Sequence, residues 1–266
     1  MGHGSLMESC LFAYPRARMS THFSGLGSAE TAWCMVPSWA RTTVGREPAL
    51  EDGWACEKSR SLQRLVLARD DVTCVFADIL DRLPDVDDEL RKSSTLDYHR
   101  AKAIVMQSRV LGHAHCATHG SQRPVSRIEV NVSGSPCTPR SKSRAVGPCG
   151  ARRGNKDILL SLAWCRIIRE DRPGIVIHEN VRGFDVNVLE ELLGDVYDIT
   201  AGDVSPQDLG FSFIARPRVY LRLDAARANC TDDGRASVVP NWGGHGCPNR
   251  RAIAIGIDGG ARGGAR

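Results

Sequence analysis

The chain has 266 residues, 42% of them hydrophobic and 25% charged, and a formal net charge of +4 at pH 7. These proportions are those of a folded globular protein, so disorder throughout the chain is not expected. The length suffices for one large α/β domain or two small ones. A net charge this small does not by itself indicate a nucleic-acid partner, because that inference depends on where the basic residues lie.

Cysteine usage and hydropathy bear on the compartment. The ten cysteines are spread singly along the chain with no CxxC pair, which favours reduced thiols over a disulfide framework. No stretch approaches the roughly 18 apolar residues of a membrane span, and the N-terminal MGHGSLMESCLFAYPRARMS lacks the apolar core of a secretion signal. We therefore expect an intracellular protein with no membrane partner, nuclear in a eukaryote and otherwise cytoplasmic.

Short apolar runs alternate with helical patterns along the middle of the chain. The helical pattern at 157–171 ends before Pro173, and a shorter one at 186–194 is stopped by Gly194. The runs that predict strands are CVFADI at 74–79, RIEVNV at 127–132, GIVIHEN at 174–180 and RVYLRL at 218–223. This alternation predicts an α/β fold with a mostly parallel, doubly wound sheet covered by helices on both faces.

Three local expectations accompany this pattern. In RIEVNV, strict alternation places Ile128, Val130 and Val132 on one face of a strand. Residues 82–122 form a long polar insert that is expected to be helical around LDYHRAKAIVMQSRVL. The tail from Asp224 is rich in glycine and arginine and is expected to be irregular.

The stretch FSGLGSAETAW, at 23–33, resembles a strand-to-helix turn that approaches a ligand. Gly25 and Gly27 would allow close approach of the backbone, and the amides at the start of the following helix can bind a carboxylate or phosphate. Because glycine also punctuates ordinary loops, an ordinary turn is the alternative.

Two acidic residues follow strand patterns. Glu57 comes after GWAC, and Asp78 ends CVFAD. Ligands of doubly wound sheets lie at the carboxyl ends of the strands, and an acid after the second strand typically binds ribose hydroxyls. Asp78 would then lie where an adenine amino group could bind. The alternative for both acids is a solvated helix cap.

Cys137 lies between Pro136 and Pro139 just after the predicted strand 127–132. A free cysteine is most often an inert buried side chain, and reactivity requires a lowered pKa and access. The basic residues downstream, uninterrupted by any acid, would favour a thiolate and attract phosphates; they are Arg140, Lys142, Arg144, Arg152, Arg153 and Lys156. Cys149 also follows a proline, but in a glycine-rich loop with no predicted strand before it, so Cys137 is preferred.

Polar residues also flank the last two predicted strands. Glu179 ends an apolar run and therefore falls on the same edge of the sheet as Cys137, where a carboxyl group could protonate the ring edge of a flipped base. Arg216 and Arg218 lie two residues apart before the next strand and so point to one side. Their guanidinium groups could clamp a phosphate or orient catalytic groups.

The order F-x-G-x-G, Glu, Asp, Pro-Cys, Glu-Asn-Val, Arg-x-Arg, each at a strand end, resembles the cytosine-C5 DNA methyltransferase family over about residues 20–223. The resemblance implies a Rossmann-like methyltransferase fold, S-adenosylmethionine as cofactor and DNA as substrate. It implies that Cys137 is the nucleophile that attacks C6 and so activates C5 of a flipped cytosine. Glu179 would bind the cytosine edge, and Arg216 and Arg218 would be the arginines of the family's Q-x-R-x-R motif.

The remaining site residues follow from the same resemblance. The S-adenosylmethionine site would comprise Phe23, Ser24, Gly25 and Gly27, with Glu57 on the ribose and Asp78 on the adenine. The substrate would be contacted by Pro136, Asn180 and the basic residues Arg140, Lys142 and Arg144, which match a mobile loop of the family.

The chain departs from the family pattern at several points. Ile214 stands where the Q-x-R-x-R motif has its glutamine, the strand expected before Phe23 is the polar RARMSTH, and no target-recognition region is recognisable after Leu223. We therefore expect an extension at 1–19, a catalytic domain at 20–223 with the insert 82–122, and a tail at 224–266.

Two alternatives remain open. One is a non-catalytic or partner-dependent remnant that binds S-adenosylmethionine or nucleic acid, with a protein partner supplying target recognition. The other is a tRNA cytosine-C5 methyltransferase.

The stretch HAHCATH, at 113–119, offers four side chains that can bind zinc. Their spacing matches no standard pairing of ligands, and one helix could not direct all four inward. No metal site is therefore expected.

Overall fold

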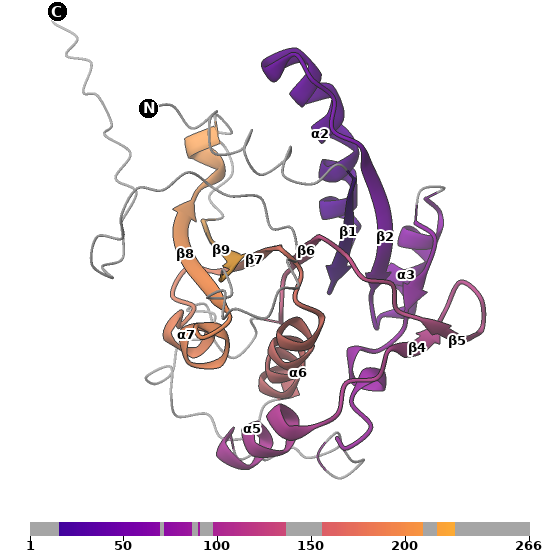
Figure 1. Cartoon of the computed structure of the whole chain (residues 1–266), viewed down its shortest axis with the longest axis vertical. Coiled ribbons are helices and arrows are strands. Elements are labelled where there is room, and N and C mark those ends of the chain that lie inside the picture. The colour runs from indigo at the N-terminus through magenta and orange to yellow at the C-terminus, as the bar shows by residue number, and fades with distance from the viewer. Residues whose placement is uncertain are drawn as a thin grey trace, which may run out of the picture.

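The computed structural model describes residues 16–69, 72–86, 90, 98–136, 156–209 and 217–226 (Figure 1). Within these residues one sheet has the strand order β5-β4-β3-β2-β1-β6-β7-β9-β8. The strands are β1 (Ala17–His22), β2 (Leu50–Cys56), β3 (Val75–Phe76), β4 (His113–Cys116), β5 (Ser121–Pro124), β6 (Val130–Ser133), β7 (Ile175–Val181), β8 (Tyr197–Val204) and β9 (Arg218–Ala225). The helices are α2 (Ser28–Val44), α3 (Arg60–Leu67), α5 (Tyr98–Gln107), α6 (Lys156–Asp171) and α7 (Asn187–Leu193), with short 3₁₀ turns η1 (Ile79–Arg82) and η3 (Pro206–Leu209).

The centre of the sheet is parallel and its two edges are antiparallel. Strand β1 pairs in parallel with β2 and β6, β2 continues to β3, and β6 continues to β7. The hairpin β4–β5 is antiparallel to β3, and β9 runs antiparallel between β7 and β8. The predicted α/β fold with a mostly parallel, doubly wound sheet is confirmed.

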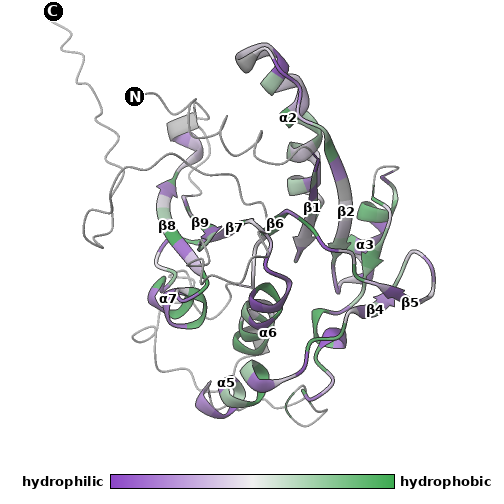
Figure 2. Ribbon diagram, in the orientation of Figure 1, coloured by the Kyte–Doolittle hydropathy of each residue, from purple (hydrophilic) through white to green (hydrophobic). Residues whose placement is uncertain are grey.

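Helices cover both faces of this sheet because buried side chains alternate along its strands. In β2, Ala55 packs with Val66 of α3 on one face, whereas Trp54 and Cys56 join the large core on the other. That larger core includes Trp164 and the hydrophobic residues of α6 and α7 next to the sheet (Figure 2). Among the described residues, no helix is both long and apolar enough to cross a membrane.

Several element predictions are confirmed and others are corrected. The helices predicted at 157–171 and 186–194 appear as α6 and α7, and the strands predicted at 174–180 and 218–223 appear as β7 and β9. The strand predicted at 74–79 is only two residues long, and the chain already enters η1 at Ile79. The strand predicted at 127–132 begins at Val130, and Ile128 packs in the core opposite to that of Val130.

The insert is part of the fold and contains both helix and strand. Its predicted helix is α5, and it ends in the hairpin β4–β5, which was not predicted. Arg82, almost fully buried, donates hydrogen bonds to both carboxylate oxygens of Asp171 at 2.6 and 2.8 Å and to the carbonyl of Leu111 at 2.9 Å. The Arg166 side chain donates to the carbonyl of Ser108. These contacts attach the insert to α6.

Gly53 is required where β1 and β2 approach each other. The register of this pair shifts between Met19 and Ser20, and a Cβ atom on Gly53 would lie 2.7 Å from the Met19 carbonyl oxygen. Gly53→Ala would force the two backbones apart, and we expect it to lower the free energy of unfolding by about 1–3 kcal/mol. Urea denaturation would measure this loss.

The matched control is Gly112→Ala. A Cβ atom at Gly112 meets nothing within 4 Å, so this variant should change the unfolding free energy by less than about 0.5 kcal/mol. Equal losses in both variants would contradict a specific clash at Gly53.

Candidate active site at the carboxyl edge of the sheet

The strand order reverses between β1 and β6. From β1 the chain builds outward through β2 and β3, and it later returns to place β6 and β7 on the other side of β1. In sheets of this kind, ligands bind in the crevice outside the carboxyl ends of the strands at this reversal. The loops after β1 and β6 are direct neighbours, because His22 pairs with Ser133 and the Gly134 N–H donates to the His22 carbonyl at 3.4 Å.

The predicted glycine loop is a tight strand-to-helix turn after β1. Phe23, Gly25 and Gly27 have φ values of 60°, 59° and 76°, a left-handed conformation that glycine adopts readily and phenylalanine does not. The Phe23 N–H holds the turn by donating to the Cys56 carbonyl at 2.9 Å. Such local strain occurs most often at ligand sites, and α2 begins immediately after Gly27.

Glu57 binds this glycine loop directly. One carboxylate oxygen accepts the Gly25 N–H at 2.9 Å, and the other accepts the Ser59 N–H at 2.7 Å. Glu57 is 9% exposed, so it differs from the solvated cap that was the alternative interpretation. Because each carboxylate oxygen has two lone-pair sites, both oxygens can still accept a hydroxyl group of a ligand.

Asp78 follows β3 and caps η1. One of its oxygens accepts the Leu80 N–H at 3.0 Å, and the other is 2.7 Å from the Lys58 ammonium. Its side chain therefore performs the capping role of the alternative interpretation, on the same edge as Glu57. The Lys58 side chain is mostly exposed, so this ion pair contributes little to stability.

Sequence reasoning missed Glu30, in the first turn of α2. Glu30 is 3% exposed, and one of its oxygens accepts the Thr21 hydroxyl at 2.5 Å. The other oxygen is buried without a hydrogen-bond partner among the described residues, and it lies 3.7 Å from where a Cβ atom of Gly27 would be. Buried polar atoms are normally paired. The signal in the sequence was an acid three residues after Gly27, but nothing there indicated that it is buried.

Glu179 lies beside the loop that leads to Cys137. Its carboxylate is 2.5 Å from the Arg218 guanidinium, and its other oxygen lies 3.2 Å from the position of a Cβ atom on Gly134. Arg218 reaches this edge because β9 is antiparallel, so that Val181 pairs with Arg218 at the end of β7. The structure thus brings Glu179 and Arg218 together on one edge of the sheet.

Buried polar side chains of β7 hydrogen-bond the end of β6 and the loop that leads to Cys137. The Asn180 amide donates to the Ser135 hydroxyl at 3.3 Å and its oxygen accepts the Val181 N–H at 2.9 Å. His178 hydrogen-bonds the hydroxyls of Ser133 and Ser135 through its two ring nitrogens, at 3.0 and 3.3 Å. Asn180 is only 2% exposed, and its hydrogen bonds support the loop. The partly buried Pro136 is the last residue of this loop that the structure describes.

Other predicted site residues lie outside the described part of the chain. They are the proposed nucleophile Cys137, the basic residues Arg140, Lys142 and Arg144, and Arg216. Their roles remain predictions.

Comparison with known proteins gives structural likenesses only. No family model matches the chain, and no curated protein matches its sequence. A solved protein described as a putative DNA modification methyltransferase of an E. coli prophage is 16% identical to this chain, with a TM-score of 0.46. The aligned part covers 79% of this chain and 47% of the solved chain. The S. pombe Dnmt2 methyltransferase is 14% identical to this chain, with a TM-score of 0.44. The aligned part covers 79% of this chain and 50% of the Dnmt2 chain.

The Entamoeba histolytica methyltransferase EhMeth is 13% identical to this chain, with a TM-score of 0.44. The aligned part covers 79% of this chain and 53% of the EhMeth chain. The chain thus spans about half the length of these solved chains. Likenesses of this degree leave the chemistry of the chain to be inferred from its own residues.

Proposed function

We propose that this protein transfers a methyl group from S-adenosylmethionine to C5 of a cytosine in DNA, through a covalent bond between Cys137 and C6 of a flipped base. One observation carries the proposal. Glu179, ion-paired with Arg218, lies against Gly134, three residues before the proposed nucleophile, and the same edge of the sheet carries the strained glycine loop. An acid, a thiol and a cofactor loop are the groups that this reaction requires together.

The residues at the ends of β1, β2 and β3 fit S-adenosylmethionine. Gly25 and Gly27 carry no side chain that would obstruct a ligand at the turn, and Glu57 keeps lone pairs for ribose hydroxyls. Asp78 lies at the next strand end, where it would accept the adenine amino group. The unpaired oxygen of Glu30 suits an ammonium group. When bound, S-adenosylmethionine supplies an electrophilic methyl group.

The chain's own residues would make cytosine reactive. For this step Glu179 must first take up a proton from solvent. The Cys137 thiolate adds to C6, the electrons of the C5–C6 double bond shift through C4 to N3, and Glu179 gives that proton to N3. Arg218 balances the charge that this leaves on the Glu179 carboxylate. After C5 has taken the methyl group, a base removes the C5 proton, the Cys137–C6 bond breaks and releases the thiolate, N3 returns its proton to Glu179, and the ring regains its aromaticity.

A base in a duplex is out of reach of such a site, so the substrate base must be flipped out. Arg140, Lys142 and Arg144, which follow Cys137 in the sequence, would bind the phosphates around it. Target recognition would come from residues outside the described part or from a protein partner.

The experiment is methyl transfer from labelled S-adenosylmethionine to duplex DNA and, in parallel, to tRNA. Label on C5 of cytosine in DNA supports the proposal. Label on tRNA alone would replace it with the tRNA activity, and binding of S-adenosylmethionine without transfer to either substrate would favour a non-catalytic remnant.

A further inference from the structure

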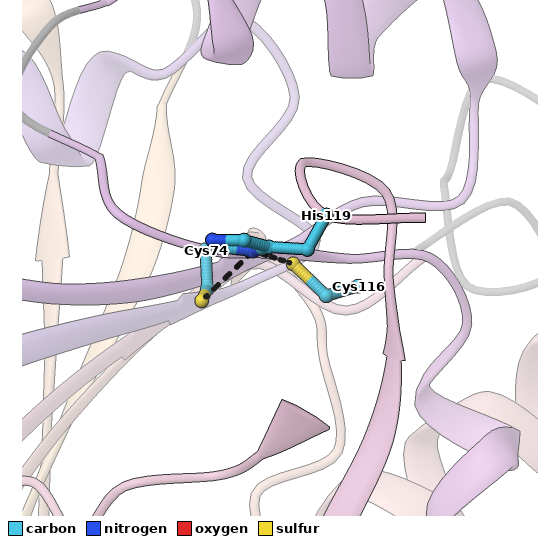
Figure 3. A group of neighbouring side chains, drawn as sticks. All are labelled: Cys74, Cys116 and His119. Carbon is cyan, nitrogen blue, oxygen red and sulfur yellow. Dashed lines mark hydrogen bonds between the residues drawn. The ribbon is translucent and has the colours of Figure 1, made fainter. Parts of the chain in front are cut away.

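Three side chains that can bind a metal lie close together beside β3, near the residue where this strand begins. Cys74 immediately precedes β3, Cys116 ends β4, and His119 lies in the turn that follows (Figure 3). The Cys74 and Cys116 sulfur atoms are 3.8 and 3.2 Å from Nδ1 of His119. All three donor atoms lie within 4.8 Å of one another.

Contacts between β3 and residues 116–118 hold the three donor atoms close to one another. Phe76 pairs with Cys116 across the antiparallel strands β3 and β4. The Ala117 N–H donates to the Val75 carbonyl at 2.7 Å, and the Val75 N–H donates to the Thr118 hydroxyl at 3.0 Å. The donor atoms are therefore held together by the sheet itself.

The expectation for HAHCATH considered a single helix, which could not direct all four side chains inward, but the local structure is different. It is a strand followed by a turn, so Cys116 is buried whereas His113 and His115 are exposed. Of its four candidate ligands, Cys116 and His119 belong to the group of close donor atoms, and they lie three residues apart, a spacing also found in zinc sites. The third ligand comes from Cys74, more than forty residues away by sequence.

We propose that Cys74, Cys116 and His119 bind a zinc ion, with a water molecule from solvent as the fourth ligand. With zinc–sulfur bonds of about 2.3 Å and zinc–nitrogen bonds of about 2.1 Å, a tetrahedral site needs sulfur–nitrogen separations of about 3.6 Å. The two observed separations of 3.8 and 3.2 Å fall on either side of this value. Two thiolates and an imidazole are soft ligands that select zinc over magnesium or calcium.

The site is distinct from the candidate active site. Cys74 precedes β3 whereas Asp78 follows it, so the cluster lies at the amino end of the strand and the active site at the carboxyl end. The ion would join the hairpin β4–β5 to β3, with which the hairpin forms the single register pair Phe76–Cys116.

The protonation of the two thiols is compatible with this role. Burial opposes ionisation of Cys116, but hydrogen bonds with His119 and Thr118 outweigh it and lower its pKa to about 7. Burial, followed by the neighbouring Cys116, raises the pKa of Cys74.

The test is metal content of the full chain, purified under reducing conditions, supplied with zinc and dialysed, then measured by elemental mass spectrometry. We expect about one zinc ion per chain at this site. Cys74→Ser and His119→Gln should each lower retained zinc about tenfold. Cys74 is only partly buried and His119 is exposed, and circular dichroism would verify that each variant is folded.

Two matched controls separate this site from other thiols and imidazoles. Cys34→Ser, at an exposed cysteine of α2, and His115→Gln, at an exposed histidine of β4, should retain zinc as the parent does. The proposal is overturned if the parent retains no zinc, if the controls lose as much as the ligand variants, or if mass spectrometry finds Cys74 and Cys116 joined by a disulfide after reduction.

Cobalt substitution adds a spectroscopic readout. Cobalt bound by two thiolates should give a thiolate-to-metal charge-transfer band that weakens in Cys74→Ser and stays unchanged in Cys34→Ser. A spectrum of the parent without this band would also overturn the proposal. Neither measurement depends on methyl transfer.

Discussion

Glu179→Gln is expected to reduce the rate of methyl transfer by roughly 10²- to 10⁴-fold, the range of a lost general acid. Glutamine has nearly the shape of glutamate, so it can keep its place between Arg218 and Gly134, but it has no proton to give to N3 of the base. The affinity for S-adenosylmethionine should change by less than about twofold, because the variant removes an interaction made in the transition state. Single-turnover rates and equilibrium binding would measure both effects.

The control is Glu190→Gln, at an exposed position of α7. It removes the same charge and should leave both the rate and the affinity as in the parent. If Glu179→Gln transferred methyl groups at the parent rate, Glu179 would be a structural partner of Arg218 and the proposed proton transfer would be wrong.

The location of the candidate site was predictable because two general rules apply to it. Apolar runs that alternate with helices make a parallel sheet, and the carboxyl ends of parallel strands share one edge. Glu57, Asp78 and Glu179 each follow such a run, so the sequence alone placed them together. Arg218 obeys a different rule: it begins its strand, and it reaches the same edge only because β9 is antiparallel.

Contacts that depend on tertiary packing were not predictable. Alternation in RIEVNV put Ile128 on the face of Val130, but the strand begins only at Val130, so the period of two does not apply before it. The strand β8 has an alternation too weak to stand out, and it is stabilised by its pairing with β9. Cys74 gave no signal as a ligand, because its partners are distant in sequence.

For polar side chains, too, the position along the chain was predictable and the hydrogen-bond partners were not. The sequence indicated that Glu57 and Asp78 lie at strand ends, but not that Glu57 binds the Gly25 amide whereas Asp78 binds Lys58 and caps η1. It also gave no indication that Glu30 is buried with one unpaired oxygen. Position along a strand can be inferred from pattern, whereas hydrogen-bond partners depend on how neighbouring loops pack.

Cys137→Ala is expected to abolish methyl transfer and, more specifically, the covalent bond to the base. DNA with 5-fluorocytosine at the target position allows addition of the thiolate and methyl transfer, but C5 then carries fluorine in place of the proton that must leave. The Cys137–C6 bond should therefore persist and survive denaturing electrophoresis. The parent chain should form this complex only when S-adenosylmethionine and the substituted DNA are both present.

Cys149→Ala is the matched control, because Cys149 also follows a proline and lies in the same basic stretch. It should form the complex as the parent does, whereas Cys137→Ala should form none. A complex that disappears in Cys149→Ala and persists in Cys137→Ala would move the nucleophile to Cys149. Loss of the complex in Cys137→Ala with retained binding of S-adenosylmethionine would show that the thiol acts on the base and that the cofactor site forms independently of it.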